Sequence, residues 1–140
     1  MAEVERNKEI VRRWIEEVWG TGNAELMDEL LDENIVDHNP IPGVPPGREG
    51  NKSLLRMFHA AFDIAMKLDL LLADGDYVVD RWTASMTHKG EFMGIPTTGK
   101  QVRLTGIDIS RFKEGKVMET WHQEDNLGLM QQLGAIPAPA

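Results

Sequence analysis

The sequence predicts an α+β domain in which helices come first and a mostly antiparallel sheet follows. Apolar residues in the first half of the chain recur at the three- and four-residue spacing of helices. In the second half, short stretches of alternating residues are separated by turns, which is typical of strands. Helices followed by a run of strands indicate an α+β fold, whereas strands alternating with helices would indicate a parallel sheet.

Three helices are expected in the first half. The first, over residues 4–19, ends at Gly20, and Asn23 can cap a short second helix over residues 24–31. A loop rich in proline and glycine follows a brief extended piece, and the third helix is expected over residues 48–66. Apolar side chains lie along one face of each helix, so all three can cover one side of the sheet.

Tight turns divide the second half into strands. Four strands are expected, over residues 66–73, 77–88, 101–112 and 117–125, and a short helix follows the last one. The chain contains no internal repeat, low-complexity tract or linker. We therefore expect a single domain over residues 1–140.

Composition and charge exclude several classes of function. The net charge is −8 and the basic residues are scattered, which argues against a nucleic-acid partner. There are no cysteines, and the four histidines lack the spacing of metal ligands, so we expect neither a metal nor another cofactor. No segment resembles a signal peptide or supplies the roughly 20 apolar residues that cross a bilayer. The expectation is a cytoplasmic protein without a membrane partner.

The strongest candidate site lies in the stretch GIDISRFKEGKVMETWHQED, residues 106–125. A tight hairpin here places Asp108 opposite His122 on neighbouring strands, among residues expected to be buried. A carboxylate beside an imidazole is an acid/base arrangement, because the carboxylate orients the ring and stabilises its protonated form. The pair could equally be structural and close the end of the sheet, and the residues alone leave both interpretations open.

Several single residues are weaker candidates. His38 and Asn39 could overhang the mouth of a pocket, or they could form a turn with the nearby proline. Trp82 could line a cavity or pack in the core. Asp125 could cap the terminal helix or take part in chemistry. His88 is expected in solvent at the end of a strand.

Three motifs in the second half resemble one family, and they are GDYVVDRWTASMTHKGEFMGIPTTGK, GIDISRFKEGK and ETWHQEDNLGLMQQLG. Together with the N-terminal NKEIVRRWIEEVWGTGNAELMDELLDENIVDHNP, they are similar to the SnoaL-like polyketide cyclases. This family, also called predicted ester cyclases, belongs to the NTF2-like superfamily. The resemblance implies an NTF2-like cone, with a strongly curved mixed sheet wrapped on the helices and a deep apolar pocket open at one end.

The resemblance also implies roles for individual residues. In the characterised anthracycline cyclases of this family, an aspartate on the last strand is the acid/base of an intramolecular aldol ring closure. A histidine on the preceding strand supports it. Those two positions correspond to His122 and Asp108, so the residue types are exchanged in this chain. The implied substrate-binding residues, in the pocket or at its rim, are His38, Trp82, Trp121, Asp125 and Met118.

These observations predict a cofactor-independent enzyme that acts on a hydrophobic carbonyl compound by aldol-type ring closure or a related isomerisation. In this hypothesis His122, oriented by Asp108, removes a proton next to a carbonyl. Two alternatives stay open, namely a non-catalytic protein that binds a small apolar ligand, and a hydrolase or hydroxylase on the same fold. Because both faces of the sheet carry apolar residues, we also expect a homodimer.

Overall fold

The computed structural model describes residues 2–138 and contains one five-stranded sheet with helices against it. The helices are α1 (Glu3–Arg13), α2 (Met27–Leu30), α3 (Gly47–Ala61) and α4 (Asn126–Gln132). The strands are β1 (Leu31–Asp37), β2 (Phe62–Asp74), β3 (Tyr77–His88), β4 (Gln101–Lys113) and β5 (Lys116–Glu124). Within residues 2–138, no helix is long and apolar enough to cross a membrane.

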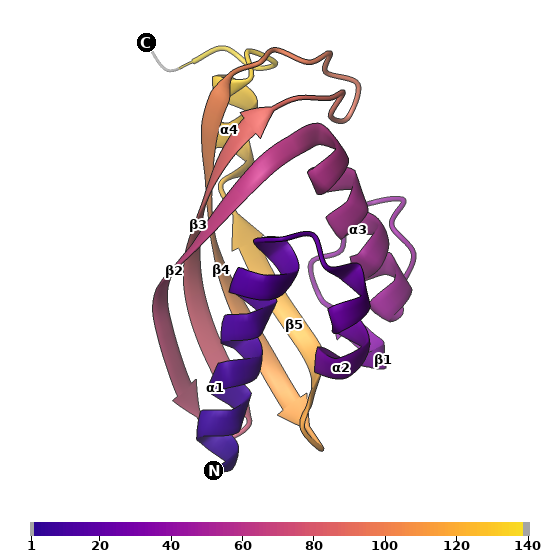
Figure 1. The fold of residues 1–140 in the computed structure, drawn as a ribbon, viewed down its shortest axis with the longest axis vertical. Helices are drawn as coiled ribbons and strands as arrows, with labels where there is room; N and C mark the ends of the chain where they lie inside the picture. Colours follow the sequence, from indigo (N-terminus) through magenta and orange to yellow (C-terminus); the bar gives the residue numbers. More distant parts are fainter. Residues whose placement is uncertain (1, 139–140) are drawn as a thin grey trace.

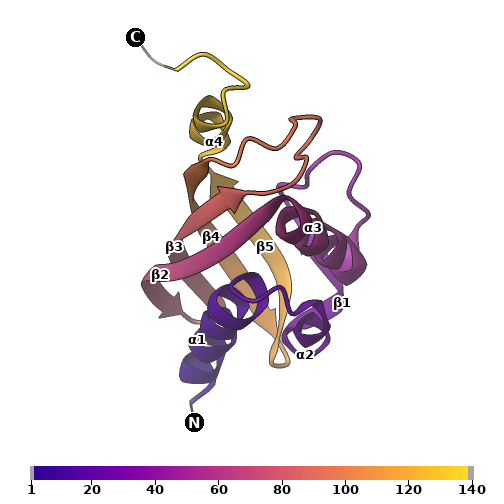
Figure 2. The ribbon, with the colours of Figure 1, turned by 45° about the horizontal axis from the view of Figure 1, so that its top comes forward.

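The sheet is mixed and strongly curved, and α1, α2 and α3 lie on the same side of it (Figure 1, Figure 2). Its strands follow the order β1-β5-β4-β3-β2. β1 runs parallel to β5, and every other neighbouring pair is antiparallel. The predicted α+β class, with N-terminal helices on a curved and mostly antiparallel sheet, is therefore confirmed.

The first two predicted helices are present with changes in their local geometry. After α1 the chain continues as a π-helical segment, Trp14–Trp19, so the two together cover the predicted range. Acidic residues in the first turn of α1 and basic residues in its last turn complement the helix dipole. Asn23 caps the next segment as predicted, because its side chain accepts a hydrogen bond from the backbone N–H of Leu26 at 3.3 Å.

The predicted end of the third helix is wrong. α3 stops at Ala61, and Phe62 already belongs to β2, although the helix was expected to reach residue 66. Apolar residues at 62, 64 and 66 suit both a continuing helix and an alternating strand. The segment is a strand because it pairs with β3, starting with Phe62 opposite His88.

The two faces of the sheet differ in burial. On β3 and β4 the even-numbered residues turn toward the helices, and Val78, Trp82 and Leu104 are buried there. The odd-numbered residues of β3 and β4, together with the residues of β2 that pair with them, form what we call the outer face. On this face Ile107 is 50% and Ile109 is 37% exposed. The exposed apolar residues of the outer face are Leu70, Leu72, Tyr77, Ile107 and Ile109.

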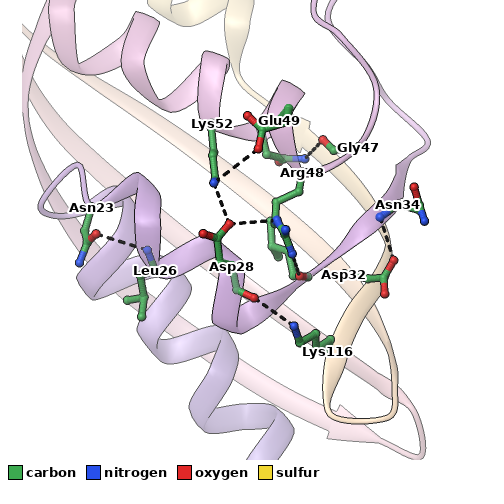
Figure 3. Close-up of polar contacts among 12 residues, drawn as sticks. Asn23, Leu26, Asp28, Asp32, Asn34, Gly47, Arg48, Glu49, Lys52 and Lys116 are labelled. Atoms are coloured by element: carbon green, nitrogen blue, oxygen red, sulfur yellow. Dashed lines mark hydrogen bonds and ion pairs between the residues drawn. The ribbon is translucent and has the colours of Figure 1, made fainter.

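Ion pairs at Asp28 connect α2 with α3 in the helix layer (Figure 3). The Asp28 carboxylate lies 2.7 Å from Nζ of Lys52 and 3.1 Å from Nε of Arg48, both on α3. Arg48 also donates a hydrogen bond to the backbone oxygen of Leu31, at 3.2 Å, and Lys116 donates one to the backbone oxygen of Asp28. These contacts fix the start of β1, the strand whose far end carries the carboxylate of Asp37.

Candidate active site

An apolar cavity of about 110 Å³ lies between the helix layer and the inner face of the sheet. Its walls are formed mainly by large apolar side chains, including Trp14, Ile15, Trp19, Phe58, Met66, Met86 and Leu104. Most of its polar groups lie on or just after β1, β4 and β5, and Asn51 reaches it from α3. The groups of the strand side are Asp37, Asp108, Thr120, His122, Glu124 and Asn126. A concave apolar site with a few convergent polar groups is typical of small-molecule sites.

The predicted pairing of Asp108 with His122 across the hairpin is confirmed. The two residues are direct partners in the register of β4 and β5. Asp80 is in turn the partner of Asp108 on β3. Asp80, Asp108 and His122 thus form a row across three neighbouring strands, on the face that meets the helices.

The hydrogen-bond partners of the His122 ring differ from the predicted one. Nε2 lies 2.9 Å from Oδ2 of Asp37, and Nδ1 lies 2.5 Å from Oε1 of Glu124. The backbone N–H of His122 donates to Oδ1 of Asn39 at 2.9 Å. The carboxylates that orient the imidazole are therefore those of Asp37 and Glu124, and Asp108 is a neighbour that stands beside this group in the cavity wall.

These contacts keep a proton on His122. Burial alone would lower the pKa of the ring, but the hydrogen bonds to Asp37 and Glu124 outweigh it and raise the pKa of His122 to about 10. Burial also acts on Asp37, yet the hydrogen bonds from His122 and from the backbone of Asn39 hold its pKa below the ordinary value. At neutral pH the group is an imidazolium between two carboxylates.

Asp108 is held from another direction by Trp82. The indole Nε1–H donates to Oδ2 of Asp108 at 3.0 Å, and Trp82 is 8% exposed. Trp82 and Gly106 are partners across β3 and β4, and a Cβ at position 106 would lie 2.2 Å from the indole Cζ2. A residue without a side chain is therefore required at 106 for the indole to reach the carboxylate.

Two carboxyl groups, those of the buried Asp80 and the partly buried Asp108, have raised pKa values. Burial is the main cause for both, because it disfavours the charged form. For Asp108, hydrogen bonding and the charge of His122 offset part of this rise, whereas the neighbouring charge of Asp108 adds to the rise for Asp80. Asp108 is thus a more basic carboxylate than one in water, and it faces the cavity.

Four of the residues implied as substrate contacts are absent from the cavity wall. His38 and Trp121 stack on each other outside it, with ring centroids 4.5 Å apart and planes at 8°. Asp125 caps α4 and accepts a hydrogen bond from the backbone of Gly128 at 3.0 Å. The register between β5 and β4 shifts at Met118, because its neighbours Val117 and Glu119 pair with two adjacent residues of β4. Only Trp82 of the five lines the cavity.

The remaining histidines are structural. His88 was expected in solvent but is 1% exposed, because the loop after β3 folds back over it and the backbone N–H of Thr98 donates to its Nδ1 at 3.1 Å. The ring of His59 on α3 bonds the backbone oxygen of Trp19 at 2.8 Å. Neither ring lines the cavity.

The sequence analysis missed Asp37 and Glu124. A signal existed for Glu124, since it stands two residues from His122 and so shares its face of the strand. For Asp37 the signal was the segment VDHNP, in which His38 and Asn39 were the candidates instead. Adjacent residues of a strand face opposite sides, so a choice wrong by one residue selects the outer face.

The fold is NTF2-like, with carboxylates and an imidazole in the wall of an apolar cavity, and comparison with known families agrees with this class. The family model for the SnoaL-like polyketide cyclase matches residues 9–133. The chain belongs to this family, as its motifs predicted. Membership supports a cyclase-type function.

Relatives with known names include one curated enzyme. The aklanonic acid methyl ester cyclase DauD of Streptomyces sp. (strain C5) is 26% identical over 133 residues, covering 90% of this chain and 80% of DauD.

Solved structures share the fold closely. TsrD from Streptomyces laurentii has a TM-score of 0.86 and 28% identity, covering 94% of this chain and 97% of TsrD. A candidate polyketide cyclase from Bacillus cereus ATCC 10987 has a TM-score of 0.83 and 35% identity, covering 94% and 82% of the two chains. AclR from Streptomyces galilaeus, a candidate hydroxylase, has a TM-score of 0.85 and 25% identity, covering 98% and 86%.

Proposed function

We propose that the protein is a cofactor-independent acid/base enzyme that converts a hydrophobic carbonyl compound by aldol-type ring closure or a related isomerisation. One observation carries the proposal. A partly buried carboxylate of raised pKa, Asp108, stands next to a protonated imidazole, His122, in the wall of an apolar cavity. A proton acceptor beside a cation is what enolate formation needs, since the acceptor takes the proton and the cation stabilises the oxyanion.

The roles of the two residues follow from their protonation. The sequence alone suggested His122 as the base, but an imidazole that holds its proton at neutral pH cannot accept another. We therefore assign proton removal to Asp108 and stabilisation of the enolate oxygen to His122. The substrate oxygen would share an imidazolium N–H with Asp37 or Glu124, whose side chains also line the cavity.

The proposed reaction needs no added reagent. The proton leaves the carbon next to a carbonyl and goes to Asp108. The enolate carbon then attacks a second carbonyl of the same molecule and forms the new carbon–carbon bond. The resulting alkoxide takes the proton back from Asp108, so the enzyme ends as it began. The apolar walls would fold the substrate so that the two reacting carbons meet.

Hydrogen–deuterium exchange at carbon tests the first step without knowledge of the natural substrate. A neutral 1,3-diketone in D₂O, followed by NMR, should exchange its acidic C–H faster with the protein than in buffer. Asp108→Asn should slow the catalysed exchange by on the order of 10²-fold to 10⁴-fold. Trp121→Phe, on the outer face, is the matched control and should leave it unchanged.

Two outcomes would decide against this assignment. If Asp108→Asn catalyses exchange as fast as the original protein, Asp108 is not the base. If the diketone binds with unchanged exchange, the alternative of a non-catalytic binding protein takes over.

A second candidate function is hydroxylation, and the resemblance to AclR, a candidate hydroxylase, favours it. The same carbanion could instead add dioxygen and form a hydroperoxide, which would lose water to leave a new carbonyl group, so that dioxygen is the only oxidant needed. Reactions run under ¹⁸O₂ and in H₂¹⁸O separate the two candidates by mass. A ring-closed product without new oxygen supports the cyclase, and incorporation of label supports the hydroxylase.

At the level of the whole protein, we propose a single domain over residues 1–140, active in the cytoplasm as a homodimer. Its ligand is a hydrophobic small molecule, not a nucleic acid or a membrane. The outer face supports the dimer, because Leu72 is 56% exposed there and stands in one row with Val79 and the exposed Ile109. Contiguous exposed apolar residues on a sheet commonly mark a protein interface.

A further inference from the structure

Asp80 is a buried acid to which the proposed reaction gives no role. It is 0% exposed and does not line the cavity. Among the described residues, neither of its carboxyl oxygens has a hydrogen-bond partner. An ionised carboxylate in this position would have lost its hydration and gained no donor in return, which is strongly unfavourable. Asp80 therefore needs a proton to be stable where it is.

The acceptor for that proton is on the neighbouring strand. Asp108 is the direct partner of Asp80 in the antiparallel register, and such partners on one face have Cβ atoms about 4.5–5.5 Å apart. Two carboxylates this close inside a protein do not both ionise. A proton on Asp80 supplies the missing donor, and the hydrogen bond to Asp108 satisfies both groups.

The surroundings decide which of the two keeps the proton. Asp108 receives the indole N–H of Trp82 and is flanked by the cationic His122, and both favour its charged form. Asp80 has neither. The other titratable groups that face this pair are Glu124 on β5 and Asp37 on β1, and both are bonded to His122. The proton therefore belongs on Asp80.

We propose that Asp80 is a positioning residue, whose protonated carboxyl donates a hydrogen bond to Asp108 and holds that carboxylate ionised and fixed in orientation for proton removal. The inference rests on the proposed function of Asp108. It adds a neutral acid behind the base, outside the reach of substrate. Trp82 and Asp80 then bond the same carboxylate from two sides and leave its remaining lone pairs to the cavity.

Two substitutions separate this role from simple packing. Asp80→Asn keeps the shape and an N–H donor that cannot ionise, whereas Asp80→Leu keeps the volume and removes the donor. The carboxyl ¹³C shifts of Asp80 and Asp108, followed by NMR from acid to alkaline pH, report both protonation states without substrate. Ser110→Ala, buried two residues from Asp108 on the same strand, is the matched control.

The expected result has three parts. In the unaltered protein the Asp80 signal has the protonated value at neutral pH. In Asp80→Leu the pKa of Asp108 rises by at least about one unit, because the ionised form has lost a donor, and in Asp80→Asn it stays near its original value. Catalysed exchange falls by roughly tenfold to a hundredfold in Asp80→Leu and is largely restored in Asp80→Asn.

The proposal would be overturned if the Asp80 signal has the ionised value at neutral pH, or if both variants leave the titration of Asp108 unchanged. These NMR readouts do not depend on turnover. If the proposed function is wrong and the inference on Asp80 is right, the unaltered protein will not catalyse exchange, yet its Asp80 signal will still have the protonated value. If Asp80→Leu does not fold, Asp80→Asn and the Asp80 signal alone still decide the question.

Discussion

At the scale of single residues, the most informative group is the His122 ring between Asp37 and Glu124. Each ring nitrogen has a carboxylate partner within hydrogen-bond distance. A histidine with one carboxylate is usually a proton shuttle, whereas one with two carboxylates is stabilised as a cation. Because of this difference, His122, expected to be the base, is instead proposed as the cation that stabilises the enolate oxygen, and its protonation can be measured directly.

NMR titration of His122 is the measurement for this point. The ring should stay protonated through neutral pH and titrate near the raised pKa of about 10. Asp37→Asn should lower that pKa clearly, because the amide cannot supply a negative charge. Asp108→Asn should change it less, since Asp108 is not bonded to the ring. A larger effect of Asp108→Asn would show that the ring turns toward Asp108 in solution.

The same group makes stability depend on pH. The pKa of His122 is raised on folding, from about 6.5 in the unfolded chain to about 10. Its stabilising contribution is therefore complete below about pH 6.5, falls as the pH rises through this window, and is lost above about pH 10. The free energy of unfolding should exceed that of His122→Gln by more at about pH 6 than at about pH 9.5. Equal differences in urea denaturation at the two pH values would contradict the assignment.

Gly106 and Trp82 form a second residue-scale unit. Gly106→Ala should push the indole away from Asp108 and destabilise the protein by about 1–3 kcal/mol, as overpacking does. The cost should shrink in a Trp82→Phe background, where the ring that meets the new methyl group is smaller. Urea denaturation of the two single variants and the double variant tests this. If the destabilisations of the two single variants simply add in the double variant, the strain does not come from contact between the new methyl group and the indole.

At the scale of elements, local sequence determined the β4–β5 hairpin and could be used to predict it. A short turn fixes the register, so Asp108 opposite His122 followed from counting. The pairing of β1 with β5 could not be predicted this way. Val36 pairs with Glu119, which lies far from it in the sequence, and no turn between them fixes the register. The carboxylate of Asp37 therefore entered the site only with the structure.

Asn39 ties these two elements together at the site. Its side-chain oxygen accepts the backbone N–H of His122, at 2.9 Å, just beyond the end of β1. Asn39→Ala should leave that N–H without its partner and cost about 1 kcal/mol. The amide of His122 should then exchange with solvent faster in NMR. The amide of Ile107, on β4, is the internal control, and its exchange should be unchanged.

At the scale of the whole molecule, the outer face is the feature that a single chain leaves unexplained. The sequence predicted cover on both sides of the sheet, and the helices supply it on only one (Figure 2). Family membership and fold class were predictable because motifs extend along most of the chain. The partner of the outer face was not, because apolar side chains do not specify what covers them.

Ile107→Glu tests the proposed dimer. A charge at this exposed position, 50% accessible in the single chain, should be tolerated by the fold but not by an apolar interface. We expect a dimer for the unaltered protein and a monomer for the variant, measured by light scattering after size exclusion. Arg6→Glu, an exposed residue of α1 in the helix layer, is a charge-changing control away from the outer face. A monomeric unaltered protein would refute the dimer.

The cavity has an excess of negative charge, and this bears on which molecules can enter. Three carboxylates, those of Asp37, Asp108 and Glu124, line it together with one imidazolium. A ligand with a free acid group would be repelled by this field, whereas the corresponding ester would not. Such a site would admit an ester and exclude the ionised acid without any direct contact to the ester group.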